Sequence, residues 1–319
     1  MRRLVFKARF LWLVVVAVLA GAWPIVAQAS IPTIPPLLTA ANFAAIAGIA
    51  LTCTDSNVTG QVGVNFGTPV TSTGCTMQAA QYDPTGIQAF KDFRSAYDAI
   101  AAHLGPSTTP SGCDQTFTIA NTLDGVTLGP GTYCFDSYAQ LTGTLHLKGG
   151  GPWLFEIGTS GTGYIEATNF TVISDNPCNA FWWVHDYVTL TTSAFQGTIL
   201  GGSAITTTGT SLVGNAWATV ALSMTGSNIL GCGAIPSGTT PQCLTAQQAL
   251  DVAKAQDVIE DASERASDKK RGKDKDDEDK AHGDSHDSKK DKKEDKAENA
   301  LMSSLQRAVR KACSSEHDG

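Results

Sequence analysis

Basic side chains are scarce in the central part of this 319-residue sequence. Residues 51–235 contain only Lys91, Arg94 and Lys148, against eleven acidic side chains. Proteins that bind nucleic acid need a basic patch to neutralise phosphates, and this region cannot supply one. The composition therefore predicts that the chain does not bind nucleic acid.

The sequence also lacks the motifs of common metal and catalytic sites. It has no C-x-x-C pair, which argues against a zinc ribbon, and no G-x-S-x-G turn accompanies His185, Asp186 and Ser193. Enzymes that cleave sugars need paired carboxylates, or a base beside a carboxylate, whereas we expect Glu156 and Glu166 to be isolated at the surface or at coil edges. We predict no enzymatic activity, no cofactor, no metal and no small-molecule substrate.

The N-terminus has the pattern of a secretory signal peptide at residues 1–29. Four basic residues precede the apolar run 11–22, and small residues at 27–29 suit a cleavage site. An uncleaved membrane anchor is the alternative, although Pro24 interrupts a run that barely spans a bilayer. The pattern predicts a secreted or cell-surface protein, extracellular or periplasmic.

Eight cysteines in an exported chain indicate disulfides. Their spacing suggests three pairs that each close a short loop, with Cys178 and Cys313 left over. The suggested pairs are Cys53–Cys75, Cys113–Cys134 and Cys232–Cys243.

A long helix is expected at about residues 84–104, inside a region rich in Gly, Thr, Ser and β-forming residues. Asp83 and Pro84 form a helix start signal, and apolar residues then recur at helical spacing. One apolar stripe indicates that this helix packs along a β body. We divide the chain into a Pro-rich lead-in (30–36), a β domain (37–235), a helical segment (244–266), a disordered charged linker (267–296) and a C-terminal helical segment (297–319).

Three segments of the β domain repeat at an offset of 17 residues. They are VTLTTSAFQG (188–197), ITTTGTSLVG (205–214) and LSMTGSNILG (222–231). This period is too short for a helical hairpin and suits one coil of a β-solenoid, in which each coil stacks on the next.

Strand alternation divides each repeat into a core-facing and a solvent-facing set. The solvent-facing set forms a grid two residues wide and three coils deep: Thr189, Thr191, Thr206, Thr208, Ser223 and Thr225. Ser193, Thr210, Ser227 and Asn228 are expected to extend it past a corner. Because threonine is stiff at χ1, a flat array of this kind can hold methyl and hydroxyl groups in a fixed pattern. Such an array suits a crystalline surface, above all ice with its ordered water. The alternative is that threonine simply favours strands and keeps an exposed face soluble.

The chain resembles the microbial ice-binding-like domain family over about residues 37–232. The matching stretches occur in the family's order, and they are ANFAAIAGIALTCT, VTGQVGVNFGT, FRSAYDAIAAH, DGVTLGPGTYCF, AQLTGTLHL, WLFEIG, CNAFWWV and the three repeats. Some members carry a Thr-Ala/Gly-x-Thr/Asn motif, which residues 225–228 match fully, residues 208–211 match except at the last position and residues 191–194 match only at the first. The resemblance implies a mainly β fold, a right-handed discontinuous β-solenoid (β-helix) of triangular cross-section with one long α-helix alongside. It also implies that one flat face binds ice and inhibits recrystallisation.

A cell-surface adhesion or matrix module of the same fold is the alternative function. It would bind a cell envelope component or a matrix polymer through exposed aromatic rings. Alternation puts Trp182 and Trp183 on opposite sides of one strand, so one of them is expected to be less buried.

Overall fold

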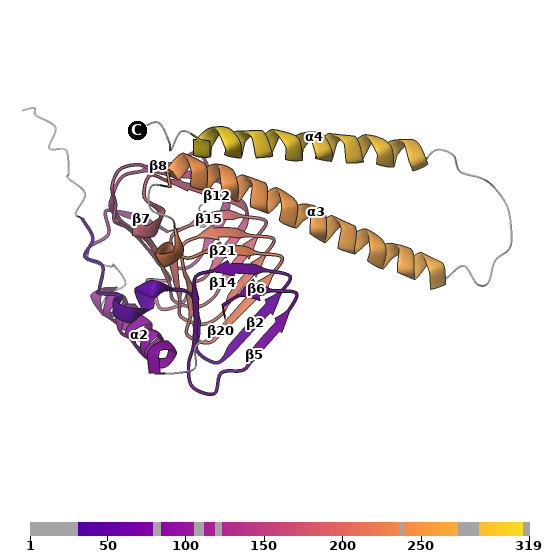
Figure 1. Cartoon of the computed structure of the whole chain (residues 1–319). Helices are drawn as coiled ribbons and strands as arrows, with labels where there is room; N and C mark the ends of the chain where they lie inside the picture. The colour runs from indigo at the N-terminus through magenta and orange to yellow at the C-terminus, as the bar shows by residue number, and fades with distance from the viewer. Residues whose placement is uncertain are drawn as a thin grey trace, which may run out of the picture.

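The computed structural model describes residues 31–78, 84–104, 112–118, 123–235, 239–273 and 287–314. The predicted signal peptide lies outside these residues. The strands of a solenoid form the body of the molecule, and two long helices project from it (Figure 1). The predicted mainly β solenoid is confirmed.

An eight-stranded parallel sheet forms the first side of the solenoid. Its strands are, in spatial order, β4 (Gln61–Val64), β1 (Phe43–Ala47), β19 (Ala216–Ala218), β16 (Thr198–Gly201), β13 (Ala180–Val184), β11 (Trp153–Ile157), β9 (Gly131–Phe135) and β7 (Gln115–Phe117).

A thirteen-stranded sheet forms the second and third sides, because the long strand β12 (Ile165–Ser174) pairs with different strands through its two halves. The second side contains β14 (Val188–Thr191), β17 (Ile205–Thr208), β20 (Ala221–Thr225), β2 (Ala50–Thr54) and β5 (Val70–Thr73). The third side contains β15 (Ala194–Gln196), β18 (Ser211–Val213), β21 (Asn228–Leu230), β3 (Asn57–Thr59) and β6 (Thr76–Met77). At the far end β10 (Ala139–Leu147) pairs with β12 and with β8 (Thr127–Leu128).

The order of coils in space differs from their order along the chain. Strand β1 pairs with β19 and β2 pairs with β20, so the coil 43–59 stacks on the coil 216–230. The coil 61–77 then stacks on 43–59 and is the last coil at that end.

Inward-facing apolar side chains fill the solenoid as columns. One column below the second side contains Ile165, Val188, Ile205, Leu222 and Leu51, each at most 1% exposed. Because every coil contributes a residue of similar shape at the same position, the core continues without interruption from coil to coil.

Helices cover two of the three sides. α2 (Pro84–Leu104), at the predicted position, packs on the first sheet through a second apolar cluster that includes Phe93, Tyr97, Trp183 and Trp217. α3 (Pro241–Lys273) lies on the third side, and α4 (Asp287–Ser314) runs beside α3 (Figure 1). Three short 3₁₀ helices complete the described elements, η1 (Leu38–Asn42), η2 (Pro177–Asn179) and η3 (Cys232–Ala234).

The disulfide prediction is right for two pairs and wrong for the third. Cys53–Cys75 and Cys113–Cys134 form as predicted, whereas Cys232 pairs with Cys178, and Cys243 pairs with Cys313. Cys178 precedes β13 and Cys232 follows β21, and the solenoid brings these positions to the same corner. Cysteines pair because they are close in space, and a short separation along the sequence does not guarantee that closeness.

The predicted disordered linker 267–296 is helical at both ends. α3 continues to Lys273 and α4 begins at Asp287, and the residues between them lie outside the described part of the chain. The low hydrophobicity of this segment does not prevent helix formation, because lysine, glutamate, arginine and alanine all have high helix propensity.

Within the described residues, the helices do not combine the length and the hydropathy needed to cross a bilayer.

Candidate functional site

The six predicted grid residues lie in two straight columns on the second side. Thr189, Thr206 and Ser223 occupy equivalent positions of β14, β17 and β20. Thr191, Thr208 and Thr225 form the parallel column two residues further along each strand. All six side chains are partly or fully exposed, so the coils are in the register that the 17-residue repeat predicts.

The columns continue over two further coils that sequence reasoning did not assign to them. Thr52 pairs with Ser223 and Thr54 with Thr225, and Thr71 and Thr73 follow on β5. We call these ten residues the hydroxyl grid: Thr189, Thr191, Thr206, Thr208, Ser223, Thr225, Thr52, Thr54, Thr71 and Thr73. With rungs about 4.8 Å apart, five rungs extend over roughly 19 Å.

A column of small apolar residues borders the hydroxyl grid. Ala204, Ala221 and Ala50 each lie two residues before a grid residue, and each is half-buried. Ala221 pairs directly with Ala50. The pattern Ala-x-Thr/Ser-x-Thr therefore recurs on three adjacent coils, at 204–208, 221–225 and 50–54. Recognising this pattern would have identified the additional coil at 50–54 from the sequence.

Aromatic and charged residues mark the end of this flat region. Tyr138, Tyr164 and Tyr187 stack in the same column as the alanines, on the coils before Ala204. Their ring centroids are 5.2 Å apart for Tyr138 and Tyr164, and 4.7 Å apart for Tyr164 and Tyr187. The exposed Glu166 lies beside Thr189 in the first column of the grid. Partial desolvation and the adjacent Glu166 carboxylate raise the pKa of Tyr187. The uncharged flat surface thus begins at the coil that follows Glu166.

Three of the four residues expected to extend the grid are buried. Ser193, Thr210 and Ser227 are at most 3% exposed, and each hydroxyl donates a hydrogen bond to the carbonyl two residues earlier. The residue between donor and acceptor has a left-handed backbone, with φ of 45° at Thr192 and 56° at both Gly209 and Gly226. This turn ends the alternation of the strand, so the next hydroxyl points into the corner and not to solvent.

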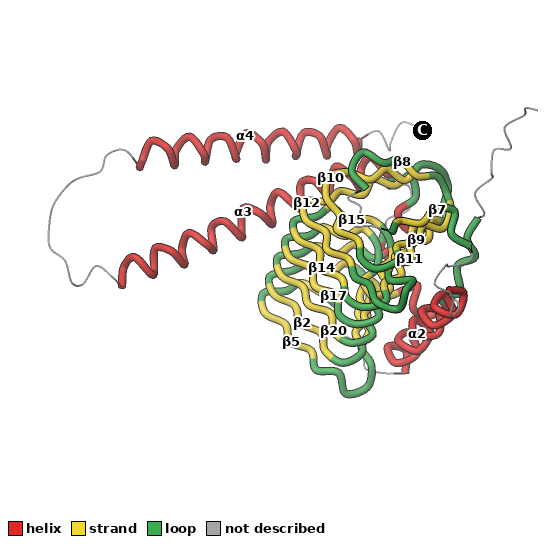
Figure 2. Tube along the Cα trace, turned by 180° about the vertical axis from the view of Figure 1, so that it is seen from behind, coloured by secondary structure: helices red, strands yellow, loops and turns green. Residues whose placement is uncertain are grey.

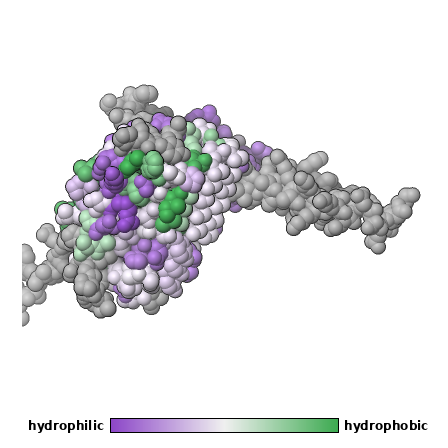
Figure 3. Space-filling view, turned by 90° about the horizontal axis from the view of Figure 1, so that it is seen from below, coloured by the Kyte–Doolittle hydropathy of each residue, from purple (hydrophilic) through white to green (hydrophobic). Residues whose placement is uncertain are grey.

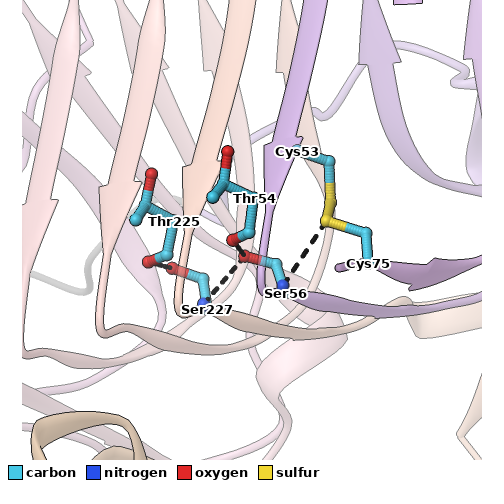
Figure 4. Close-up of a disulfide and its surroundings, with 6 residues drawn as sticks. All are labelled: Cys53, Thr54, Ser56, Cys75, Thr225 and Ser227. Carbon is cyan, nitrogen blue, oxygen red and sulfur yellow. Dashed lines mark hydrogen bonds between the residues drawn. A yellow bond between two sulfur atoms is a disulfide. The ribbon is translucent and has the colours of Figure 1, made fainter. Parts of the chain in front are cut away.

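The buried corner hydroxyls form a ladder that links the coils (Figure 4). The backbone N–H of Thr210 donates to Ser227 Oγ (3.3 Å), and that of Ser227 donates to Ser56 Oγ (2.9 Å). Ser56 Oγ in turn donates to the Thr54 carbonyl, and the Cys53–Cys75 disulfide lies next to it (Figure 4). These residues fix the register of the coils and do not offer hydroxyls to a ligand.

Asn228, the fourth residue expected to extend the grid, lies on the third side under α3. Its Nδ2 donates to Asp251 Oδ2 of α3 (2.6 Å), and its Oδ1 accepts a hydrogen bond from Asn57. Gln248 of α3 is buried and donates to the carbonyls of Phe195 and Ser211. The motif at 225–228 therefore spans a corner, with Thr225 on one side and Asn228 on the next.

Among the described residues, the second side is the one that no helix covers. Figure 2 looks onto its strands, which lie one below the other, with α2 at one edge and the α3–α4 pair beyond the other. The hydroxyl grid contains no charged residue. A rigid core column lies beneath it, and threonine has few χ1 rotamers, so the methyl and hydroxyl groups are held in place.

The tryptophans and Glu156 do not form a second functional surface. Trp182 and Trp183 are both at most 1% exposed, because Trp182 faces the solenoid core and α2 covers Trp183. The expectation that one of them is less buried is therefore wrong. Glu156 is 5% exposed and is not at the surface, and its burial raises its pKa to about 7. It lies close to the sulfurs of Cys113 and Cys134, but their disulfide leaves no thiolate to bind a metal.

Comparisons with known proteins agree with this geometry. The profile of the ice-binding-like family matches residues 38–230. An ice-binding protein from Nostoc sp. (strain HG1) is 34% identical over 190 residues, which cover 57% of this chain and 67% of that protein.

Two solved structures have the same fold. One is an ice-binding protein from an Antarctic biological consortium, 27% identical with a TM-score of 0.53 over 65% of this chain and 95% of the other. The second is an ice-binding protein from the Antarctic ascomycete Antarctomyces psychrotrophicus, 25% identical with a TM-score of 0.54 over 64% and 100% of the two chains.

Proposed function

The chain belongs to the ice-binding-like family, and from this premise we propose that it adsorbs to ice through the hydroxyl grid and inhibits recrystallisation. Ice and its ordered surface water are the ligand. The adsorbed protein lies with its second side against the crystal, and the helices on the other two sides stay in the liquid.

The observation that carries this proposal is the register of five coils on the side without a helix. Ten small uncharged hydroxyl residues repeat at about 4.8 Å between coils and about 6.7 Å along each strand. A crystalline ligand requires a repeating surface, because each additional rung then meets an equivalent set of water positions. Long charged side chains would disorder that water, and the grid has none.

The test places a bulky ring in the middle of the grid. We expect Thr208→Tyr to abolish recrystallisation inhibition, because the ring prevents the surrounding rungs from approaching the crystal. Folding should not change, since Thr208 is a half-buried residue of the outward-facing set. Circular dichroism and the melting temperature check this.

The matched control is Thr116→Tyr, which adds the same ring at an exposed position of β7 on the first side. This variant should inhibit recrystallisation as the parent does. Unaltered inhibition by Thr208→Tyr would show that another surface contacts ice.

Four disulfides support an oxidising compartment, in agreement with the predicted export of the chain. We propose that the protein acts outside the cell or at its surface, without enzymatic activity. The α3–α4 pair serves as a charged spacer. No observation on the described residues favours the adhesion module, because the tryptophans that it required are buried.

A further inference from the structure

The coil 61–77 at one end of the solenoid has the features of an interface. Its strands β4, β5 and β6 are the outermost strands of their sheets, so each pairs with one neighbour only. Unpaired backbone donors and acceptors at a sheet edge are a template for adding further strands.

The core is open at this end. Ser72 occupies the same inward-facing position as Cys53 of the coil before it, yet Ser72 is exposed and Cys53 is fully buried. Val70, Cys75 and Met77, which pack against the end of the core, are only partly buried. Seen from below, the surface shows hydrophobic patches next to hydrophilic ones on a pale background (Figure 3).

The end coil 61–77 contains no charged residue, and no large aromatic side chain of the part of the chain that the structure describes caps its core. No charged residue occurs between Asp55 and Asp83, although edge strands are usually protected by lysine or other charges. Phe66, in the turn between β4 and β5, is 82% exposed, and Ile49 in the adjacent turn is 61% exposed. An uncharged surface of this kind favours contact with another uncharged surface.

We propose that this end binds a second copy of the chain, end to end, about a two-fold axis through the middle of the second side. Under this symmetry β5 lies antiparallel to its counterpart, and β4 of each copy faces β6 of the other. The two open cores then close each other, with Ser72 and Phe66 at the contact. The two hydroxyl grids lie side by side on one face of the dimer, so the repeating surface doubles from five rungs to ten.

Association itself does not depend on ice binding, so it can be tested separately. Sedimentation velocity of the full chain should detect a dimer. Ser72→Lys, which places a charge at the open end of the core, and Phe66→Ser should each raise the dimer dissociation constant at least tenfold. Both positions are exposed, so both variants should keep the parent's circular dichroism spectrum.

The control is Thr116→Lys, which adds a charge to β7 at the opposite end of the first sheet. This variant should remain dimeric, because a two-fold arrangement uses only the coil 61–77. A chain that is monomeric at every concentration would overturn the proposal, and so would a dimer that resists both Ser72→Lys and Phe66→Ser. Dissociation by Thr116→Lys would indicate a head-to-tail contact and overturn it as well. If the chain dimerises as described but does not inhibit recrystallisation, the proposed function is refuted and the proposed interface is supported.

Discussion

Replacing Thr207 by valine should make the protein more stable. Thr207 lies in the core column between Leu190 and Met224 and is 1% exposed. Its Oγ1 is the one buried side-chain nitrogen or oxygen, among the described residues, that has no hydrogen-bond partner. Valine has nearly the same shape and the same β-branching, so the exchange replaces an unsatisfied hydroxyl by a methyl group and changes little else.

The expected gain follows from the cost of the unmade hydrogen bond. A buried polar group without a partner costs about 1–3 kcal/mol, so Thr207→Val should raise the free energy of unfolding by at least about 1 kcal/mol. For a domain of this size, that corresponds to an increase of roughly 2–4 °C in melting temperature. Urea unfolding should show a higher midpoint with an unchanged m-value. Recrystallisation inhibition should stay the same, because the side chain faces the core.

The matched control is Thr210→Val, where the hydroxyl does have partners. Thr210 Oγ1 is 3.2 Å from the carbonyl oxygens of both Leu190 and Thr208. Its loss should lower the free energy of unfolding by about 1 kcal/mol. A neutral or destabilised Thr207→Val protein would mean that its hydroxyl has a partner such as a buried water, and the reasoning would be wrong.

Two further predictions concern Glu156 and the C-terminal disulfide. Burial raises the pKa of Glu156 to about 7 from 4.5, so the folded state binds its proton more tightly and stability falls as pH rises from about 4.5 through 7. The free energy of unfolding measured with urea should fall by about 2–3 kcal/mol more between pH 5 and pH 9 in the parent than in Glu156→Gln, and equal falls would refute this. Cys313→Ser opens a loop of 70 residues, whose closure is worth about 4 kcal/mol in chain entropy. Limited proteolysis should then cut α4 faster while recrystallisation inhibition stays constant, and unchanged cleavage would count against the role of the disulfide.

The local parts of the fold could be predicted from the sequence. The repeat of 17 residues identified three coils and their register, because these three coils are neighbours both in space and along the chain. The helix at 84–104 followed from its start signal and its apolar stripe. The outward-facing positions of β14, β17 and β20 followed from strand alternation alone.

Two features escaped prediction because they depend on contacts between residues far apart in sequence. Thr52 continues the column of Ser223, and Cys178 meets Cys232, only because the solenoid brings them together. The buried Ser193 was misplaced for a local reason. Alternation fails at the left-handed Thr192, and a non-glycine residue gives no signal of such a backbone in the sequence.

The inverted stacking of the N-terminal coils has a consequence for biosynthesis. The last two rungs of the hydroxyl grid come from residues 52–73, which are synthesised before any other part of it, yet they stack on a coil that ends at residue 230. Contacts of such high sequence separation slow folding, and they cannot form before residue 230 has been synthesised. The five-rung grid therefore cannot assemble until almost the whole solenoid has emerged, although its two N-terminal rungs were among the earliest residues made.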